Sequence, residues 1–285
     1  MSFFRSTFTT EKIDDRTTLI IEKLFGAPCY MYLLEGEDRA ALIDTGMGGG
    51  DLQSVVRNLT SKELIVLNTH GHFDHCGANN QFGEAYIDEK DLPVLKLQQS
   101  KQYFDAILPL PLRLLLSRVL RRILYCSHDE TYRFFSDGDT FDLGGRTIEV
   151  LSAPGHSIGS VCFLDRENRY LFSGDTVVSV GVLLNLCGST NAETFLQSQQ
   201  KLRARSSEWE KIFAGHNAYP LDSKTIDQYI TCTERILDQS GERKPNRKKG
   251  YVVSYEDIRI EMPTDARVLE IPPAGTLPFI EGPLI

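Results

Sequence analysis

The chain has 285 residues, of which 41% are hydrophobic and 25% charged, and this composition excludes global disorder and a coiled coil. Its net charge of −8 is opposite to that of most nucleic-acid-binding proteins, so no nucleic-acid partner is expected. The sequence contains no apolar run long enough to cross a bilayer and no signal-peptide pattern at its start. We therefore expect a cytoplasmic protein without stable membrane association.

The cysteines are dispersed along the chain, at positions 29, 76, 126, 162, 187 and 232, and none forms a Cys-x-x-Cys pair. A chain of this length buries enough apolar surface to fold without disulfides, so reduced thiols are expected. A structural zinc ribbon is not expected, because its paired cysteines are missing.

Strands and helices alternate through the first half of the chain. Apolar runs bounded by turn residues predict strands at 19–25, 29–35, 39–44 and 64–67. Asp51 is placed to cap a helix over 52–59, where apolar side chains repeat at helical spacing. A short helix is expected at 78–82, and helical structure from 88 to 122.

The second half returns to strands and then ends in a polar and proline-rich region. Strands are predicted at 140–143, 147–152, 160–165, 170–173 and 211–214, and helices at 192–206 and 223–241. Residues 241–250 are basic and read as a surface loop, and the remainder reads as an extended strand or a wrapping tail. We expect one catalytic domain over 1–240, with residues 241–285 packing on it.

The strongest chemical signal is the pattern H-x-H-x-D-H, formed by His70, His72, Asp74 and His75 directly after the predicted strand 64–67. Imidazole and carboxylate groups suit zinc, iron or manganese. Four ligands so close in sequence cannot easily converge on one tetrahedral ion. They can serve two adjacent ions if further ligands arrive from elsewhere.

Three further candidate ligands follow the ends of predicted strands. They are His156, Asp175 and His216, and glycine precedes each of them. Strand ends at one edge of a sheet can bring such side chains together, and glycine permits a tight turn there. Five of the six histidines would then belong to one site.

These motifs, in this order, resemble the metallo-β-lactamase-fold hydrolase superfamily. The resemblance also includes Leu42-Ile43-Asp44-Thr45-Gly46 and extends over roughly residues 19–220. It implies an α/β fold, a four-layer αββα sandwich of two mixed β-sheets flanked by helices. The predicted helical insertion near 88–130 lies between the first metal motif and the next strand.

The resemblance also implies a ligand set for two divalent metal ions, with Zn²⁺ expected and iron or manganese as alternatives. The first ion is assigned to His70, His72 and His156; the second to Asp74, His75 and His216; and Asp175 bridges the two. Asp44 is expected to orient the ligand loop through hydrogen bonds. Asp74 and Asp175 are the expected catalytic carboxylates.

This ligand set predicts a dinuclear metal-dependent hydrolase in which a metal-bridging hydroxide cleaves a carbonyl bond of a small molecule. A lactone, ester or thioester is expected, as in lactonases and glyoxalase II-like relatives. A β-lactam is disfavoured, because β-lactamases carry cysteine or serine near the place of Asp175. Two alternatives stay open: a phosphodiesterase acting on a small phosphodiester, which the basic segment 241–250 favours, and an iron-dependent oxidoreductase.

Two further features bear on the substrate. Residues 109–124 predict a leucine-rich helix that could be a core helix, a lid over the site or the interface of a homodimer. Asn217 and Tyr219 follow His216 and are candidate substrate contacts.

Overall fold

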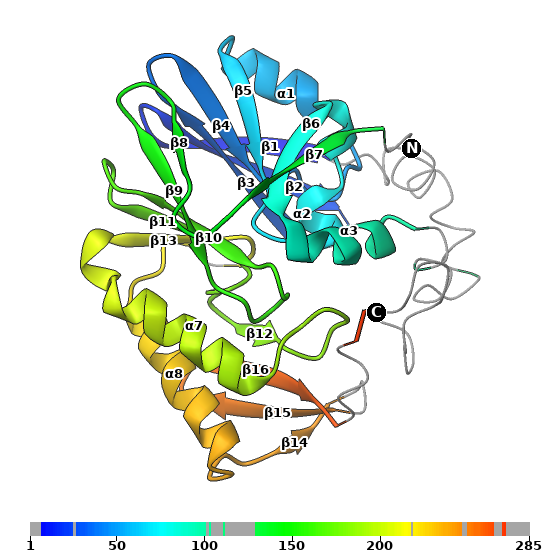
Figure 1. The fold of residues 1–285 in the computed structure, drawn as a ribbon, viewed down its shortest axis with the longest axis vertical. Helices are drawn as coiled ribbons and strands as arrows, with labels where there is room; N and C mark the ends of the chain where they lie inside the picture. The colour runs from blue at the N-terminus through cyan, green and yellow to red at the C-terminus, as the bar shows by residue number, and fades with distance from the viewer. Residues whose placement is uncertain are drawn as a thin grey trace.

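Two mixed β-sheets form the centre of the molecule in the computed structural model, which describes residues 7–24, 27–100, 129–217, 219–246 and 250–264 and the positions 103, 111, 270 and 271 (Figure 1). The first sheet follows the chain order: β1 (Thr7–Asp14), β2 (Thr17–Leu24), β3 (Ala27–Glu35), β4 (Arg39–Ile43), β5 (Glu63–Leu67), β6 (Glu84–Asp88) and β7 (Thr131–Phe135). The second has the order β13 (Lys211–Ala214), β11 (Tyr170–Gly174), β10 (Val161–Asp165), β9 (Thr147–Ser152) and β8 (Thr140–Asp142).

Helices cover the outer faces of both sheets (Figure 1). On the first sheet, α1 (Leu52–Leu59) begins at Asp51, whose side chain accepts from the Ser54 amide at 3.0 Å, as predicted. The short helices α2 (Phe73–Cys76), η1 (Asn79–Gln81), η2 (Glu89–Asp91) and α3 (Leu92–Gln98) follow β5 and β6. On the second sheet lie α7 (Ala192–Ala204) and α8 (Lys224–Leu237), with η3 (Ser206–Glu208) between them in sequence. The predicted αββα layering is confirmed.

The inner faces of the two sheets share one apolar core. It contains Tyr32, Ile43 and Leu67 from the first sheet and Phe163, Phe172 and Phe213 from the second, all buried. On the outer face of the first sheet, the alternate residues Met31 and Leu33 pack toward α1. This alternation along β3 is the period of two expected of a strand buried on both faces.

A third sheet of four strands was not predicted. Its order is β12 (Gly181–Leu183), β16 (Ile258–Pro263), β15 (Gly250–Tyr255) and β14 (Lys244–Pro245). Val253 and Ile260 of this sheet are buried in the same cluster as Tyr229 of α8, so residues beyond 240 complete the core around the helices. The sequence predicted a loop followed by an extended strand or a wrapping tail, but not a sheet, because β12 is three residues long and pairs with a strand far along the chain.

Other differences from the predicted elements are local. β1, β6 and β7 were missed, and the helix expected at 78–82 is the single 3₁₀ turn η1, preceded by α2. The predicted helix at 109–124 lies outside the described residues, except for position 111. Among the described residues, no helix combines the length and the apolar character needed to cross a membrane.

The strand directions place the candidate ligands together. β4 and β5 run parallel, so their C-terminal ends meet at one edge of the first sheet. β11 and β13 are also parallel, and β9 runs the same way because β10 is antiparallel to both of its neighbours. Each ligand-bearing segment leaves the C-terminal end of one of these strands.

Candidate metal centre

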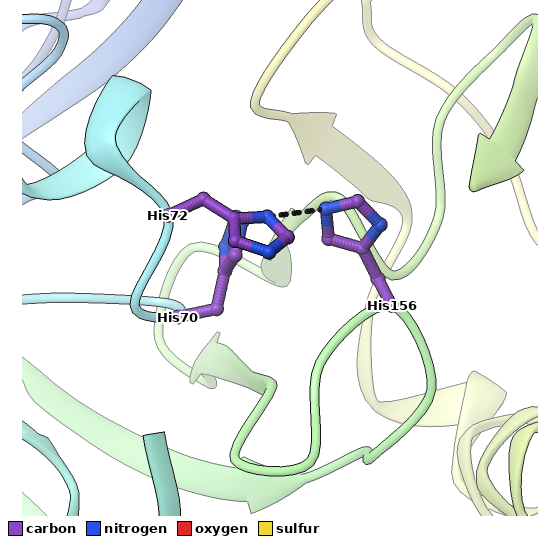
Figure 2. Close-up of side chains that lie close together, drawn as sticks. All are labelled: His70, His72 and His156. Carbon is purple, nitrogen blue, oxygen red and sulfur yellow. Dashed lines mark hydrogen bonds between the residues drawn. The ribbon is translucent and has the colours of Figure 1, made fainter. Parts of the chain in front are cut away.

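Three histidines converge where the loop after β5 meets the loop after β9 (Figure 2). His72 Nδ1 lies 3.1 Å from His70 Nε2 and 2.9 Å from His156 Nε2. All three side chains are buried. Nitrogen ligands of a tetrahedral zinc ion lie about 3.3 Å apart, given bonds of 2.0–2.1 Å. The spacing of this first cluster, His70, His72 and His156, is therefore close to that of a metal site.

Hydrogen bonds fix which nitrogen of each ring faces the site. In four of the five candidate histidine ligands, Nδ1 lies at hydrogen-bond distance from an oxygen atom. The pairs are His70 with Thr69 Oγ1 (3.0 Å), His75 with Asp44 Oδ2 (2.8 Å), His156 with the Leu183 carbonyl (2.9 Å) and His216 with the Pro28 carbonyl (2.8 Å). These oxygens accept, so Nδ1 carries a proton in each ring and Nε2 is the nitrogen that faces the site.

The first cluster has more lone pairs than protons to satisfy them. Burial and the neighbouring His75 and His72 lower the pKa of His70 well below its ordinary value. Burial, with His156 beside it, lowers the pKa of His72 to about 3. A proton on His72 Nδ1 could bond to the lone pair of only one of its two neighbours, His70 Nε2 or His156 Nε2. One cation would instead accept the lone pairs of all three nitrogens. The donor set fits a divalent ion.

A second cluster forms beside the first, from Asp74, His75 and His216. His75 Nε2 lies 3.2 Å from His216 Nε2, and His216 Nε2 lies 3.3 Å from Asp74 Oδ2. Asp74 and His75 come from α2, which begins directly after His72. His216 comes from the turn after β13. Two imidazoles and a carboxylate again form a donor set that suits zinc.

Asp175 spans the two clusters. Its Oδ2 lies 3.5 Å from His156 Nε2, while its Oδ1 lies 3.6 Å from His75 Nε2 and 3.7 Å from His216 Nε2. Oδ1 is buried and accepts no hydrogen bond within the described part of the chain. A buried carboxylate oxygen without a donor is costly unless a cation is close to it. Asp175 is thus positioned to contact metal ions at both clusters.

The second cluster is strongly polarised by its carboxylates. Burial alone would lower the pKa of His75, but Asp175, Asp44 and Asp74 outweigh it and raise that pKa well above its ordinary value. The pKa of His216 is raised in the same way, mainly by Asp175. Burial opposes ionisation of Asp175, yet the charges of His216 and His75 hold its pKa well below the ordinary range. Metal entry must therefore displace protons from these two histidines.

Asp44 orients the ligand loop from the end of β4. Its Oδ1 accepts from the Thr69 amide, and its Oδ2 accepts from Thr69 Oγ1 and from His75 Nδ1, each at 2.8 Å. The side chain is buried, and its φ of 59° lies in the left-handed region. These contacts are those of a carboxylate that fixes the tautomer and angle of a ligating histidine.

Asp91 is a second positioning carboxylate, and sequence reasoning missed it. Its Oδ2 accepts from the Gly71 amide and from Ser157 Oγ, both at 2.6 Å, and its Oδ1 accepts from the Gly159 amide at 2.8 Å. Gly71 lies between His70 and His72, whereas Ser157 follows His156. An aspartate at the end of a short 3₁₀ turn has no sequence signature that would reveal this role.

The glycines that precede Asp175 and His216 lie in close contact with other parts of the site. A Cβ on Gly174 would lie 2.5 Å from Thr69 Oγ1, and one on Gly215 would lie 2.6 Å from His75 Cε1. Gly174 also has a φ of +49°, which L side chains rarely adopt. Glycine at these positions allows the two sheets to approach each other at the site, beyond permitting a turn.

The predicted substrate contacts are placed differently from each other. Asn217 is exposed and has a φ of 66°. The Tyr219 hydroxyl donates to Glu11 Oε2 at 2.9 Å, and its ring packs edge-on against Tyr30 at 5.1 Å between centroids. Tyr219 is therefore engaged with the first sheet, and a role in substrate contact stays a prediction for both residues.

Cys29, at the start of β3, lies close to the second cluster. Its sulfur and the ligand atoms of Asp74 and His216 all lie within 4.8 Å of one another. Burial raises the pKa of the thiol to about 12, although a hydrogen bond with His216 opposes this. Nothing in the sequence around Cys29 distinguishes it from a core cysteine in a strand.

Comparison with known proteins agrees with this geometry. The sequence model of the metallo-beta-lactamase superfamily matches residues 24–236, well over half of the chain. The chain belongs to the metallo-beta-lactamase superfamily. The match includes every histidine and carboxylate of both clusters. As a member of this superfamily, the protein is classed as a metal-dependent hydrolase.

Named relatives and solved structures are moderately similar to the chain. It is 29% identical over 202 residues to the acyl-coenzyme A thioesterase MBLAC2 of Gallus gallus, covering 65% of this chain and 71% of the relative. It is 29% identical over 187 residues to the probable metallo-hydrolase YqgX of Bacillus subtilis (strain 168), covering 65% of this chain and 83% of that relative. The structure of the metallo-beta-lactamase family protein TTHA1429 of Thermus thermophilus superposes with a TM-score of 0.60 at 20% identity, covering 80% of this chain and 82% of the other. This similarity supports the αββα fold.

Proposed function

We propose that this superfamily member hydrolyses a carbonyl bond of a small molecule, foremost a thioester, with two divalent metal ions, zinc at both positions. The observation that carries the proposal is the position of Asp175. One of its oxygens faces His156 of the first cluster, and the other faces His75 and His216 of the second. A carboxylate shared in this way is what a pair of adjacent ions requires.

In this proposal, His70, His72 and His156 hold one ion, and Asp74, His75 and His216 hold the other, with Asp175 contacting both. When bound, such a pair supplies Lewis acidity, which polarises a carbonyl oxygen and makes water a nucleophile near neutral pH.

The protein groups have separate tasks. Burial disfavours the charged form of Asp74, but His75 and His216 outweigh it and hold the pKa of this carboxyl below its ordinary range. Asp74 is 23% exposed, so its ionised carboxylate can accept a hydrogen bond from an incoming water molecule and orient it. The buried imidazoles exclude water from the remaining sides of the site, which strengthens each electrostatic contact there.

A thioester is placed first because a matched relative is named an acyl-coenzyme A thioesterase. Lactones and oxygen esters come next, since the same attack on a carbonyl carbon cleaves them. The phosphodiesterase and iron-dependent alternatives stay predictions. The basic segment 241–250 that favours the first of these lies partly outside the described residues.

The test is a hydrolysis panel on zinc-loaded protein, containing an acyl-coenzyme A thioester, a lactone series, an aryl ester, a β-lactam and a phosphodiester. His72→Ala serves as the blank, because it removes one ligand of the first cluster. Glu210→Gln serves as a control, since it changes only an exposed carboxylate that pairs with Arg169 and has no place in either cluster.

We expect thioester turnover by the native protein at least a thousandfold above the His72→Ala blank, and turnover by Glu210→Gln close to the native level. Turnover of the phosphodiester alone would replace this proposal with the phosphodiesterase. Turnover that is equal in His72→Ala would refute a role for the metal cluster.

A further inference from the structure

The position of Cys29 differs from that of the other buried cysteines among the described residues. Cys76, Cys162 and Cys232 each direct their sulfur to a backbone carbonyl, of His70, Ser173 and Val253 respectively. Cys29 is only 1% exposed. Its sulfur lies instead among side chains of metal-binding type, within 4.8 Å of ligand atoms of Asp74 and His216.

Backbone contacts hold Cys29 at this place. β3 is antiparallel to β4, so the start of β3 lies at the edge where β4 ends at Ile43, next to Asp44. The residue before the cysteine, Pro28, accepts a hydrogen bond from His216 Nδ1 at 2.8 Å, and the residue after it, Tyr30, donates its amide to the Gly215 carbonyl at 2.9 Å. The thiol is therefore fixed on both sides to the turn that carries His216.

We propose that Cys29 binds the metal ion of the second cluster as a thiolate, beside Asp74, His75, His216 and Asp175. This inference rests on the proposed dinuclear function and adds a ligand to it. On binding, the S–H bond breaks, the sulfur electron pair goes to the metal, and the proton passes to solvent. The short distances from Cys29 to Asp74 and His216 place one sulfur, one nitrogen and one oxygen around the same point.

A thiolate at this cluster has a consequence for metal choice. Sulfur is a soft ligand that favours zinc over manganese and other hard cations, whereas carboxylate and imidazole alone discriminate less. The second cluster should then select zinc more strongly than the first, which has only imidazole ligands besides Asp175.

X-ray absorption at the zinc edge tests this on the full-length, zinc-loaded protein, together with its metal content. We expect two zinc ions per chain and a sulfur scatterer at about 2.3 Å, the usual zinc–thiolate distance. The scatterer should be absent in Cys29→Ser and in Cys29→Ala. It should persist in Cys232→Ser, the matched control, because Cys232 lies on α8 and contacts the third sheet.

Cobalt replacement gives an independent measurement. The native protein should show a thiolate-to-cobalt charge-transfer band in the near ultraviolet, and Cys29→Ser should lose it. In Cys29→Ser, the ratio of zinc affinity to manganese affinity should also fall by tenfold or more, and only at the second cluster.

The outcomes separate this inference from the proposed function. Two zinc ions with nitrogen and oxygen scatterers alone in the native protein would overturn the role of Cys29 and leave the hydrolase proposal standing. A sulfur scatterer that survives in Cys29→Ser would also overturn it. Failure of the native protein to bind two ions would overturn the dinuclear proposal itself. The native spectrum decides even where neither Cys29 variant folds.

Discussion

The carboxylate of Asp91 accepts a hydrogen bond from the backbone amide of Gly71 at 2.6 Å. The same carboxylate also accepts from Ser157 Oγ and from the Gly159 amide. It therefore joins the loop that carries His70 and His72 to the loop that carries His156, although the loops leave different sheets. This buried side chain therefore bridges the two halves of the first cluster.

Asp91→Asn should loosen the first cluster. An amide keeps one acceptor oxygen but turns its NH₂ toward donors that the carboxylate had satisfied, and hydrogen bonds to charged groups contribute about 1.5–3 kcal/mol each. We expect a loss of about 2–4 kcal/mol in the free energy of unfolding, measured in urea, and a metal affinity lower by about 10- to 100-fold.

Asp88→Asn is the matched control for this prediction. Asp88 lies three residues earlier, and its side chain accepts only from the local Lys90 amide at 2.9 Å. Asparagine caps a helix about as well as aspartate, so this replacement should change stability little and leave metal affinity unchanged. Equal metal affinities in native protein and Asp91→Asn would contradict the positioning role of Asp91.

Asp44→Asn should weaken the second cluster without unfolding the chain. Asparagine tolerates the left-handed backbone conformation that Asp44 adopts at φ 59°, so the substitution adds little strain. Asparagine has one acceptor oxygen where aspartate has two, so its NH₂ must face either the Thr69 amide or the donors Thr69 Oγ1 and His75 Nδ1. We expect a 10- to 100-fold loss of metal affinity, measured by competition with a chromophoric chelator. Native-like affinity in a folded variant would show that Asp44 does not orient His75.

Much of the site could be predicted from sequence because its signals are local. His70, His72, Asp74 and His75 fall within six residues, and such clustering of ligand types is rare by chance. The strands that hold the other ligands are short apolar runs bounded by turn residues, so 147–152 and 211–214 were predicted with the bounds that the structure has. The parallel directions of the strands then bring their ends together.

The features that the sequence did not reveal depend on contacts between distant segments. Cys29 reads as one apolar residue in a strand, and only the antiparallel return of β3 brings it to His216. Asp91 falls in the segment 88–122 that was predicted as helical, and nothing in that pattern indicates its contacts with Gly71 and Ser157. The third sheet depends on the pairing of β12 with β16, which no periodicity in a three-residue strand can indicate.

Removing one ligand at a time should remove one ion at a time. His156→Ala should abolish binding at the first cluster, and His216→Ala should abolish binding at the second, because each removes one of the imidazole ligands there. Asp175→Ala should weaken both sites, since its two oxygens face different clusters. The measurement is metal content by mass spectrometry after equilibrium dialysis. A His216→Ala protein that retains two ions would contradict the two-cluster arrangement.

Metal affinity should rise with pH through the neutral range. Burial works against protonation of His75 and His216, but the surrounding carboxylates raise both pKa values well above the ordinary histidine value. In the metal-free protein these imidazoles hold protons that an entering ion must displace, so affinity falls as pH is lowered. Calorimetric titration with zinc near pH 7, in two buffers of different ionisation enthalpy, should reveal net proton release. Heats independent of the buffer would contradict this prediction.

Gly215→Ala should damage the metal centre more than the fold. A Cβ at this position would lie 2.6 Å from His75 Cε1 and 2.8 Å from Asp175 Oδ1, so one of these two groups must move. We expect a loss of about 1–3 kcal/mol in the free energy of unfolding, typical of overpacking, together with a metal affinity at least tenfold lower. Dialysis against zinc and urea unfolding measure the two effects on the same samples.

Gly138→Ala separates steric damage at the site from the general cost of replacing a glycine. A Cβ on Gly138 would meet no atom within 4 Å, but its φ of +86° is strained for alanine. That variant should lose about 1–2 kcal/mol and keep its native metal content, because it changes the backbone only where no ligand lies. If Gly215→Ala likewise loses stability but binds both ions with native affinity, then the close packing of β13 against His75 and Asp175 is not what holds these ligands in place.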